Sequence, residues 1–323
     1  EQGNYEEASR FYSKALTKGK SLQDNATIAE ALRKQGQLLR KNKNFEDAIE
    51  KFSEALSIST ILNDKNSMAK TLNSMAISYY QSDDKDNALK NWLQALSIVE
   101  EIGDKSSISK YLNNIGIWYS NDQNYSQSIS YYEKSIAIKD ELGDVRNIGK
   151  TFNNLGEIYF SMGLYDDAVV QYEKSIIIKE KLKDRRGLQS SFFNRAQAYF
   201  YSDKFGEAIQ DFRQSMKMSD QKYLTNDEFR YIGMCHFYMD KFDSSSIYLS
   251  KAHDFFEKDN RKLLSLLPFL ILSDLKRGEI QSSKRYLEQF LSFIIEIDPY
   301  PEDYVLTNWS MYNVMVSMNK KNE

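Results

Sequence analysis

The sequence predicts an all-α solenoid, a stack of antiparallel helix pairs, and two observations support this fold class. The segment GLYDDAVVQYEKSIIIKEKLKD at Gly163–Asp184 recurs 40 residues earlier as QNYSQSISYYEKSIAIKDELGD, and related copies precede that one at the same interval. Self-similarity at a fixed period of tens of residues is typical of a solenoid. The chain also has only 3 prolines among 323 residues, as expected of a chain that is nearly all helix.

Each unit contains two helical patterns. In residues 106–144 the first pattern is the spacing i, i+3, i+4, i+7 of one helix face, formed by Leu112, Ile115, Gly116 and Tyr119. A polar break at 121–124 separates it from a second apolar face that begins at Tyr125. An aspartate closes the unit and can cap the next helix by accepting hydrogen bonds from its free backbone N–H groups. The equivalent aspartates are Asp24, Asp64, Asp104, Asp144 and Asp184.

The period divides residues 1–298 into an array and leaves a final segment. The array begins with a half repeat at 3–24, and seven repeats follow at about 26–64, 66–104, 106–144, 146–184, 186–222, 225–258 and 261–297. Pro268 falls inside the first helix of the last repeat and is expected to kink it. Residues 299–323 are predicted to form a terminal capping helix or a truncated repeat. Because the chain starts at a second helix, we expect it to be a fragment of a longer protein.

Small residues stand at fixed positions of both helices. The first helix has one such position, at Gly36, Ala76, Gly116, Gly156, Ala196 and Gly233. The second helix has two, at Ala8, Ala48, Ala88, Ser128, Ala168, Ala208 and Ser245 and, seven residues on, at Ala15, Ala55, Ala95, Ser135, Ser175, Ser215 and Ala252. Small side chains let two helices approach closely, while large residues fill the remaining space.

This small–large pattern resembles the tetratricopeptide repeat. The matching residues of one unit are Phe152, Leu155, Gly156, Tyr159, Tyr165, Ala168, Tyr172 and Ser175. The resemblance implies a right-handed solenoid of about seven helix pairs, with a half repeat at the start and a terminal helix. The period of 40 residues exceeds the usual 34, and the proline that commonly ends the second helix is absent. The chain is therefore most similar to the long variant found in kinesin light chains and in bacterial sensor and regulator domains. HEAT and armadillo repeats share the longer period but do not explain the small-residue positions.

Catalytic signals are close to absent, so we expect no enzyme and no cofactor or metal. The chain has two histidines and one cysteine, and it lacks the common nucleotide-binding, zinc-protease and serine-hydrolase motifs. We interpret His236 as a packed histidine, and its neighbour Cys235 points elsewhere on the same helix. The net charge of −3 argues against a general nucleic-acid binder. No apolar run reaches the length of a membrane span, so we expect a soluble segment without membrane contact, on either the cytoplasmic or the periplasmic side.

Binding residues are predicted on the first helices, because the resemblance implies that these line a concave groove in which ligands lie. One ladder along the predicted groove is Lys70, Lys110 and Lys150. A second ladder is Asn73, Asn113 and Asn153, with Asn114, Asn154 and Asn194 beside it. The positive end is extended by Arg33, and further along the array the groove becomes aromatic at Phe160, Phe193, Phe200, Tyr201, Phe237 and Tyr238.

The chemistry of these residue types suits an extended peptide. Asparagine offers both a donor and an acceptor to a peptide backbone, and the lysines could hold carboxylates. Aromatic side chains would take apolar anchors. In the alternative interpretation, duplicated repeats inherited solvated Lys and Asn, and the aromatic residues pack between helices.

We therefore predict a non-catalytic module that binds a protein or an extended peptide. By analogy with similar arrays, it is expected to be the sensing or regulatory part of a larger bacterial signalling protein. Two alternatives remain open. One is an assembly scaffold that uses its convex face or its ends, and the other is a peptide-responsive regulator that docks a response regulator.

Overall fold

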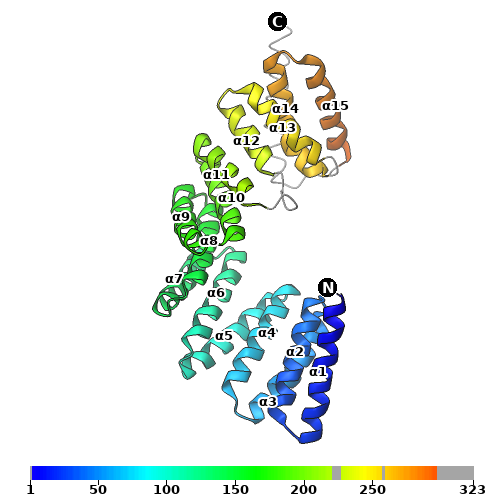
Figure 1. Cartoon of the computed structure of the whole chain (residues 1–323), viewed down its shortest axis with the longest axis vertical. Helices are drawn as coiled ribbons and strands as arrows, with labels where there is room; N and C mark the ends of the chain where they lie inside the picture. Colours follow the sequence, from blue (N-terminus) through cyan, green and yellow to red (C-terminus); the bar gives the residue numbers. More distant parts are fainter. Residues whose placement is uncertain (1, 220–226, 257–258, 297–323) are drawn as a thin grey trace. The chain divides into compact units, whose positions relative to one another are not determined.

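The computed structural model describes residues 2–219, 227–256 and 259–296, which form helices and short turns (Figure 1). The fifteen helices of this part are α1 (Gln2–Leu22), α2 (Asn25–Lys41), α3 (Phe45–Ile61), α4 (Lys65–Gln81), α5 (Lys85–Ile102), α6 (Lys105–Asn121), α7 (Tyr125–Glu141), α8 (Val145–Ser161), α9 (Tyr165–Lys181), α10 (Arg185–Tyr201), α11 (Phe205–Met218), α12 (Asp227–Tyr238), α13 (Phe242–Phe255), α14 (Asn260–Arg277) and α15 (Ile280–Glu296). The all-α prediction is confirmed: α1 is followed by seven helix pairs, from α2 and α3 to α14 and α15. The predicted terminal helix at 299–323 lies outside the described residues.

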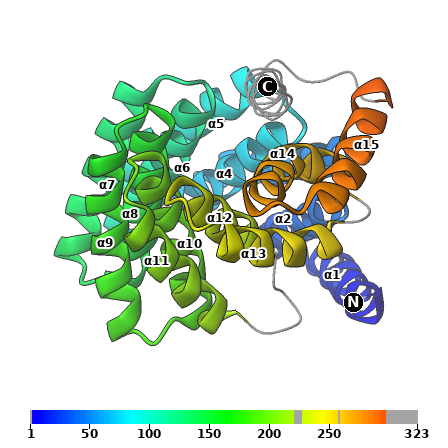
Figure 2. The ribbon, with the colours of Figure 1, turned by 90° about the horizontal axis from the view of Figure 1, so that it is seen from above.

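The chain divides into two compact units, Glu1–Ile158 and Tyr159–Glu323, and the boundary falls inside α8. Within the first unit each helix from α1 to α6 packs against the next one along the chain (Figure 1). Within the second unit α10 packs against α11 and α12 against α13, and these pairs lie side by side in Figure 2. First helices of neighbouring pairs also meet, as α2 does with α4 and α10 with α12.

Within a pair, a small residue of the first helix packs against a large residue of the second. A Cβ atom added at Gly36 would lie 2.6 Å from Cε1 of Phe52, and one added at Gly116 would lie 2.9 Å from Cδ1 of Tyr132. In both cases the large residue comes sixteen positions after the glycine. Real Cβ atoms do not approach other carbons this closely. The close approach that the small residues predicted is therefore confirmed.

The small residues of the second helices are also in the core. All of those in α3, α5, α7, α9, α11 and α13 are 0% exposed, namely Ala48, Ala55, Ala88, Ala95, Ser128, Ser135, Ala168, Ser175, Ala208, Ser215, Ser245 and Ala252. Two of the serines satisfy their buried hydroxyls on the first helix of the same pair. Ser128 Oγ donates to the Gly116 carbonyl at 2.6 Å, and Ser135 Oγ donates to the Ser109 carbonyl at 2.6 Å.

The turn that joins one pair to the next has a constant geometry. A residue with positive φ is followed by the capping aspartate, as at Asn63 (φ 52°) before Asp64 and at Gly103 (φ 79°) before Asp104. The predicted caps are confirmed, because each aspartate accepts from the backbone N–H three residues later; these are Thr27, Ser67, Ser107, Asn147 and Gly187. The hydrogen bond of its side chain with Ser107 is the main cause that lowers the pKa of Asp104.

The longest apolar run of the sequence is a core helix of the second unit. α14 continues from Asn260 to Arg277 with Pro268 inside it. Around the proline, five residues are 0% exposed, namely Leu263, Leu266, Leu267, Leu270 and Ile271. Among the described residues, no helix is both long and apolar enough to cross a membrane.

Gly36→Ala is expected to destabilise the protein by about 1–3 kcal/mol, because the new methyl group collides with the buried ring of Phe52. Gly206→Ala in α11 is the matched control, since nothing lies within 4 Å of a Cβ atom at that position. Chemical denaturation followed by circular dichroism measures both. Equal stabilities of the two variants would show that the Gly36 contact does not limit how closely the helices pack.

Candidate functional site

The predicted site residues divide between the two units. Nine lie in the first unit, on α2 (Arg33), α4 (Lys70, Asn73), α6 (Lys110, Asn113, Asn114) and α8 (Lys150, Asn153, Asn154). The other three, Phe193, Asn194 and Phe200, lie on α10 in the second unit. The structure therefore gives two separate groups, which differ in chemistry.

Asn73 joins two neighbouring first helices of the first unit. It is 6% exposed, and its Oδ1 accepts from Trp92 Nε1 at 3.2 Å and from Asn114 Nδ2 at 3.0 Å. An indole nitrogen can only donate, so this contact fixes which end of the Asn73 amide faces Trp92. Nδ2 of Asn73 donates to none of the described residues and is the end left for other contacts.

Asn113 makes the corresponding link one repeat later. Its Oδ1 accepts from Thr151 Oγ1 of α8 at 3.0 Å and from Lys139 Nζ of α7 at 3.3 Å. An ammonium group has no acceptor, so Lys139 fixes the orientation of this amide as Trp92 fixes that of Asn73. The acceptor side of both amides is thus used inside the protein, and only the donor side remains.

The other asparagines are partly buried and differ from one another. Asn153 Nδ2 donates to Glu157 Oε1 at 2.8 Å on the same helix. Asn154 is hydrogen-bonded to the hydroxyl of Tyr132, a ring whose pKa is raised mainly by burial. Asn194 lies on α10 in the second unit and is half-buried. The sequence prediction placed Asn153 in the ladder and Asn154 and Asn194 beside it, and the structure shows that Asn153 and Asn154 have different partners.

The three lysines of the predicted ladder are exposed. Lys70 and Lys110 each lie three residues before an asparagine of the ladder, which puts both side chains on the same face of the helix. None of the three lysines forms an ion pair with a residue that the structure describes, although the charge of Lys70 contributes to lowering the pKa of Asp104. We name Lys70, Asn73, Lys110, Asn113 and Lys150 the donor surface.

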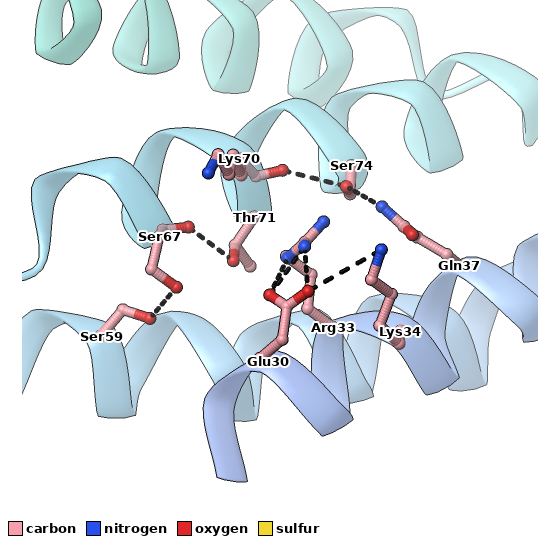
Figure 3. Close-up of polar contacts among 9 residues, drawn as sticks. All are labelled: Glu30, Arg33, Lys34, Gln37, Ser59, Ser67, Lys70, Thr71 and Ser74. Atoms are coloured by element: carbon pink, nitrogen blue, oxygen red, sulfur yellow. Dashed lines mark hydrogen bonds and ion pairs between the residues drawn. The ribbon is translucent and has the colours of Figure 1, made fainter. Parts of the chain in front are cut away.

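Arg33 does not extend the positive end as predicted. Figure 3 shows its guanidinium directed at Glu30, where Nη2 donates to Oε1 at 2.6 Å and Nε donates to Oε2 at 3.0 Å. Arg33 is 8% exposed, and the ion pair neutralises its charge. One turn later on α2, Gln37 makes a polar contact to the next pair, in which its Nε2 donates to Ser74 Oγ at 3.3 Å.

Phe193 and Phe200 pack inside the second unit, as the alternative interpretation had it. Phe200 is 7% exposed, and its ring centroid lies 5.4 Å from that of Tyr231. Phe193 packs edge-on against Phe212 with centroids 5.5 Å apart. The prediction that Phe200 lines an open groove is wrong, because the following pair covers it. Of the predicted aromatic residues, Tyr201 and Tyr238 are the exposed ones, at 48% and 40%.

Lys139 contacts the predicted site residue Asn113, and the sequence prediction did not include this lysine. It is 5% exposed, and its Nζ donates to Thr151 Oγ1 at 2.7 Å and to Asn113 Oδ1. No ion pair of Lys139 occurs among the described residues. Burial is the main cause that lowers the pKa of Lys139 from 10.5 to about 8, with Asp144 opposing and Lys150 adding to the shift.

Cys235 and His236 lie in the core region of the second unit. Cys235 is 0% exposed, and burial raises the pKa of its thiol to about 12, which keeps it protonated and unreactive at neutral pH. The ring of His236 stacks on Tyr248 with centroids 5.5 Å apart, and burial lowers its pKa. Within the described ranges, no cluster of three or more His, Cys, Asp and Glu could hold a metal ion.

Two family models describe the same type of repeat in this chain. One model of the tetratricopeptide repeat matches residues 67–141 and 147–221, and a second matches residues 29–60. Together they match more than half of the chain. The chain belongs to the tetratricopeptide repeat family. Repeats of this family are typically protein-interaction modules. The search of curated proteins gave no match.

Solved structures with a similar fold also consist of helical repeats. BtubC from P. vanneervenii has 20% sequence identity and a TM-score of 0.61, and the match covers 66% of this chain and 90% of that one. A signal transduction ATPase with a tetratricopeptide repeat sensor, from Pyrococcus horikoshii, has 16% identity and a TM-score of 0.73; the match covers 89% of this chain and 44% of that one. A Rap protein in complex with competence and sporulation factor has 15% identity and a TM-score of 0.54; the match covers 84% of this chain and 75% of that one. At these identities the similarity concerns the fold.

Asn73→Ala is expected to destabilise this tetratricopeptide array by about 1–3 kcal/mol, because it leaves the Trp92 indole and the Asn114 amide without their acceptor. The control is Asn66→Ala, an exposed position on the same helix, for which the change should stay within about 0.5 kcal/mol. Urea denaturation followed by tryptophan fluorescence measures both variants. An Asn73→Ala midpoint equal to that of the control would contradict the assigned role.

Lys139→Met is expected to alter how stability depends on pH. The pKa of Lys139 is lower in the folded protein, about 8 against 10.5, so the folded state binds fewer protons in this window and wild-type stability rises with pH. Between about pH 7 and 9.5, the free energy of unfolding of the wild type should rise by about 1–2 kcal/mol relative to that of Lys139→Met. Lys134→Met changes an exposed position of α7, and its curve of stability against pH should run parallel to that of the wild type. Denaturation series at several pH values measure this difference, and parallel curves for all three proteins would refute it.

Proposed function

We propose that this chain is a protein-binding tetratricopeptide module whose donor surface, on α4, α6 and α8, binds an acidic, extended segment of a partner protein. The observation that carries this proposal is the fixed orientation of the Asn73 and Asn113 amides. Trp92 and Lys139 can only donate, so they hold both amide oxygens inward.

A surface of this kind selects ligands by their acceptors. The exposed lysines supply ammonium groups, and the two asparagines supply N–H donors, so a bound segment has to present oxygen atoms. Carboxylates satisfy both kinds of group, because charge-assisted hydrogen bonds are about twice as strong as neutral ones. Backbone carbonyls of the same segment suit the asparagines. A basic segment is disfavoured because it brings like charge to the lysines.

Within this proposal the module is the sensing or regulatory part of a larger bacterial signalling protein. Two similar structures support this idea, the ATPase with a tetratricopeptide repeat sensor and the Rap protein in complex with competence and sporulation factor. The peptide complex of the Rap protein is also consistent with a peptide-responsive regulator.

The test compares two extended peptides with blocked ends, one of repeating Glu, Gly and Ser and one with Gln in place of each Glu. Isothermal titration calorimetry is expected to show binding of the Glu peptide only. The double variant Lys110→Ala and Lys150→Ala should weaken it at least about tenfold, because two charge-assisted contacts are lost.

The matched control is the double variant Lys90→Ala and Lys181→Ala, which removes the same charge from exposed positions of the second helices α5 and α9. It should bind nearly as the wild type does. Equal losses of affinity for the Glu peptide in both double variants would mean that the peptide is attracted non-specifically by net charge. Absence of any binding to the Glu peptide would favour the assembly scaffold, which uses the convex face or the ends of the array.

A further inference from the structure

We infer that Lys139 is a buried member of the donor surface, and that a ligand carboxylate bound over Asn113 supplies the ion-pair partner that Lys139 lacks among the described residues. This inference rests on the proposed function and deepens it, because it assigns a ligand group to one place on the surface. It also adds a residue from a second helix to a surface otherwise built from first helices.

The first step is the burial of a charge without a partner of opposite charge. Lys139 is 5% exposed, and its ammonium group donates to neutral groups, the Thr151 hydroxyl at 2.7 Å and the Asn113 amide oxygen at 3.3 Å. Burying an ammonium group is costly unless it is paired and hydrogen-bonded. The two hydrogen bonds reduce this cost but leave the ammonium group without a carboxylate in ion-pair contact among the described residues.

The second step is that packing does not require a lysine here. Steps of 40 residues along the chain lead from Lys139 to Ser59 in α3, Val99 in α5, Lys179 in α9 and Ser219 just after α11, with exposures of 0%, 2%, 6% and 7%. Val99 shows that an aliphatic residue fills this position in the preceding pair. Packing at this position therefore does not require a lysine.

The third step connects Lys139 to the surface. Asn113 lies between them, because its oxygen faces the ammonium group and its Nδ2 remains as a donor. Lys110 lies three residues before Asn113 on α6, and Lys150 directly precedes Thr151 on α8. A carboxylate that accepts from Asn113 Nδ2 thus enters a region with three lysines.

The charged groups facing Lys139 are Asp144 and Lys150, both on the segment that starts α8. Asp144 is engaged as the helix cap, since its carboxylate accepts from Asn147 N at 3.4 Å and Nδ2 at 2.7 Å. Its charge raises the pKa of Lys139, whereas Lys150 and burial lower it to about 8. An additional anion raises this pKa again, so binding near pH 8 is accompanied by proton uptake.

The experiment uses the blocked Glu peptide and calorimetry over a range of pH. For the wild type, affinity should fall about fivefold between about pH 7 and 9, because the ammonium form of Lys139 is lost as pH rises through its pKa. Near pH 8, titrations in two buffers of different ionisation enthalpy should show net proton uptake on binding. Lys139→Met should bind more weakly at pH 7 and lose both the pH dependence and the proton uptake.

Lys134→Met is the matched control, since it removes an exposed charge from the same helix, and it should keep both effects. Proton uptake that persists in Lys139→Met, or is absent from the wild type, overturns the inference. The wild-type uptake measurement decides the matter even if Lys139→Met folds poorly. Failure of the Glu peptide to bind at any pH would instead refute the proposed function itself, so the two failures are distinguishable.

Discussion

The contact of a small residue with a large one, sixteen positions later, is the constraint on which the rest of this structure depends. At Gly36 and Gly116 the paired helices approach until no Cβ atom fits against Phe52 or Tyr132. This closeness fixes the register within each pair. Because the geometry of the turn between pairs is constant as well, neighbouring pairs within each unit keep the same register relative to each other. The side chains that meet between neighbouring pairs are therefore set by the same spacing.

Side-chain hydrogen bonds join the neighbouring first helices of the first unit. Gln37 bonds to Ser74, Asn114 to Asn73, and Thr151 to Asn113, so each step along α2, α4, α6 and α8 has its own hydrogen bond. In the second unit the corresponding contact includes Gln197 and the Tyr231 hydroxyl, at 2.9 Å, beside a core of aromatic rings. The two units thus use one backbone plan with different chemistry, and this difference locates the donor surface in the first unit.

The fold was predictable from the sequence because its determinants are periodic. Helix boundaries, capping aspartates and small-residue positions all repeat, and each is a local property of the chain. The bonding of the asparagines was not predictable in this way. The partners of Asn73 lie nineteen and forty-one residues further on, at Trp92 and Asn114, so position along one helix does not reveal them. The prediction for Phe200 failed because the residue that covers it, Tyr231, belongs to the following pair and is also distant along the chain.

Lys139 left a weaker signal in the sequence. Lysine recurs at Lys179, 40 residues later, in a position where Ser59 and Val99 precede it, and a helical pattern alone assigns such a lysine to solvent. Its burial emerges only from the packing of α7 against its neighbours.

The same side chains that hold neighbouring pairs together also define what the surface can bind. The amide oxygens of Asn73 and Asn113 accept hydrogen bonds from other residues of the protein, so only the N–H groups of these amides remain for a ligand. A ligand that accepts from their Nδ2 atoms polarises the amides and strengthens the hydrogen bonds on the opposite side, to Trp92, Asn114, Lys139 and Thr151. In the proposed complex, binding of an acidic segment and packing between pairs therefore reinforce each other. Because linkage is reciprocal, the proposal also implies that a change that strengthens these hydrogen bonds between α4, α6 and α8 raises the affinity for the acidic segment.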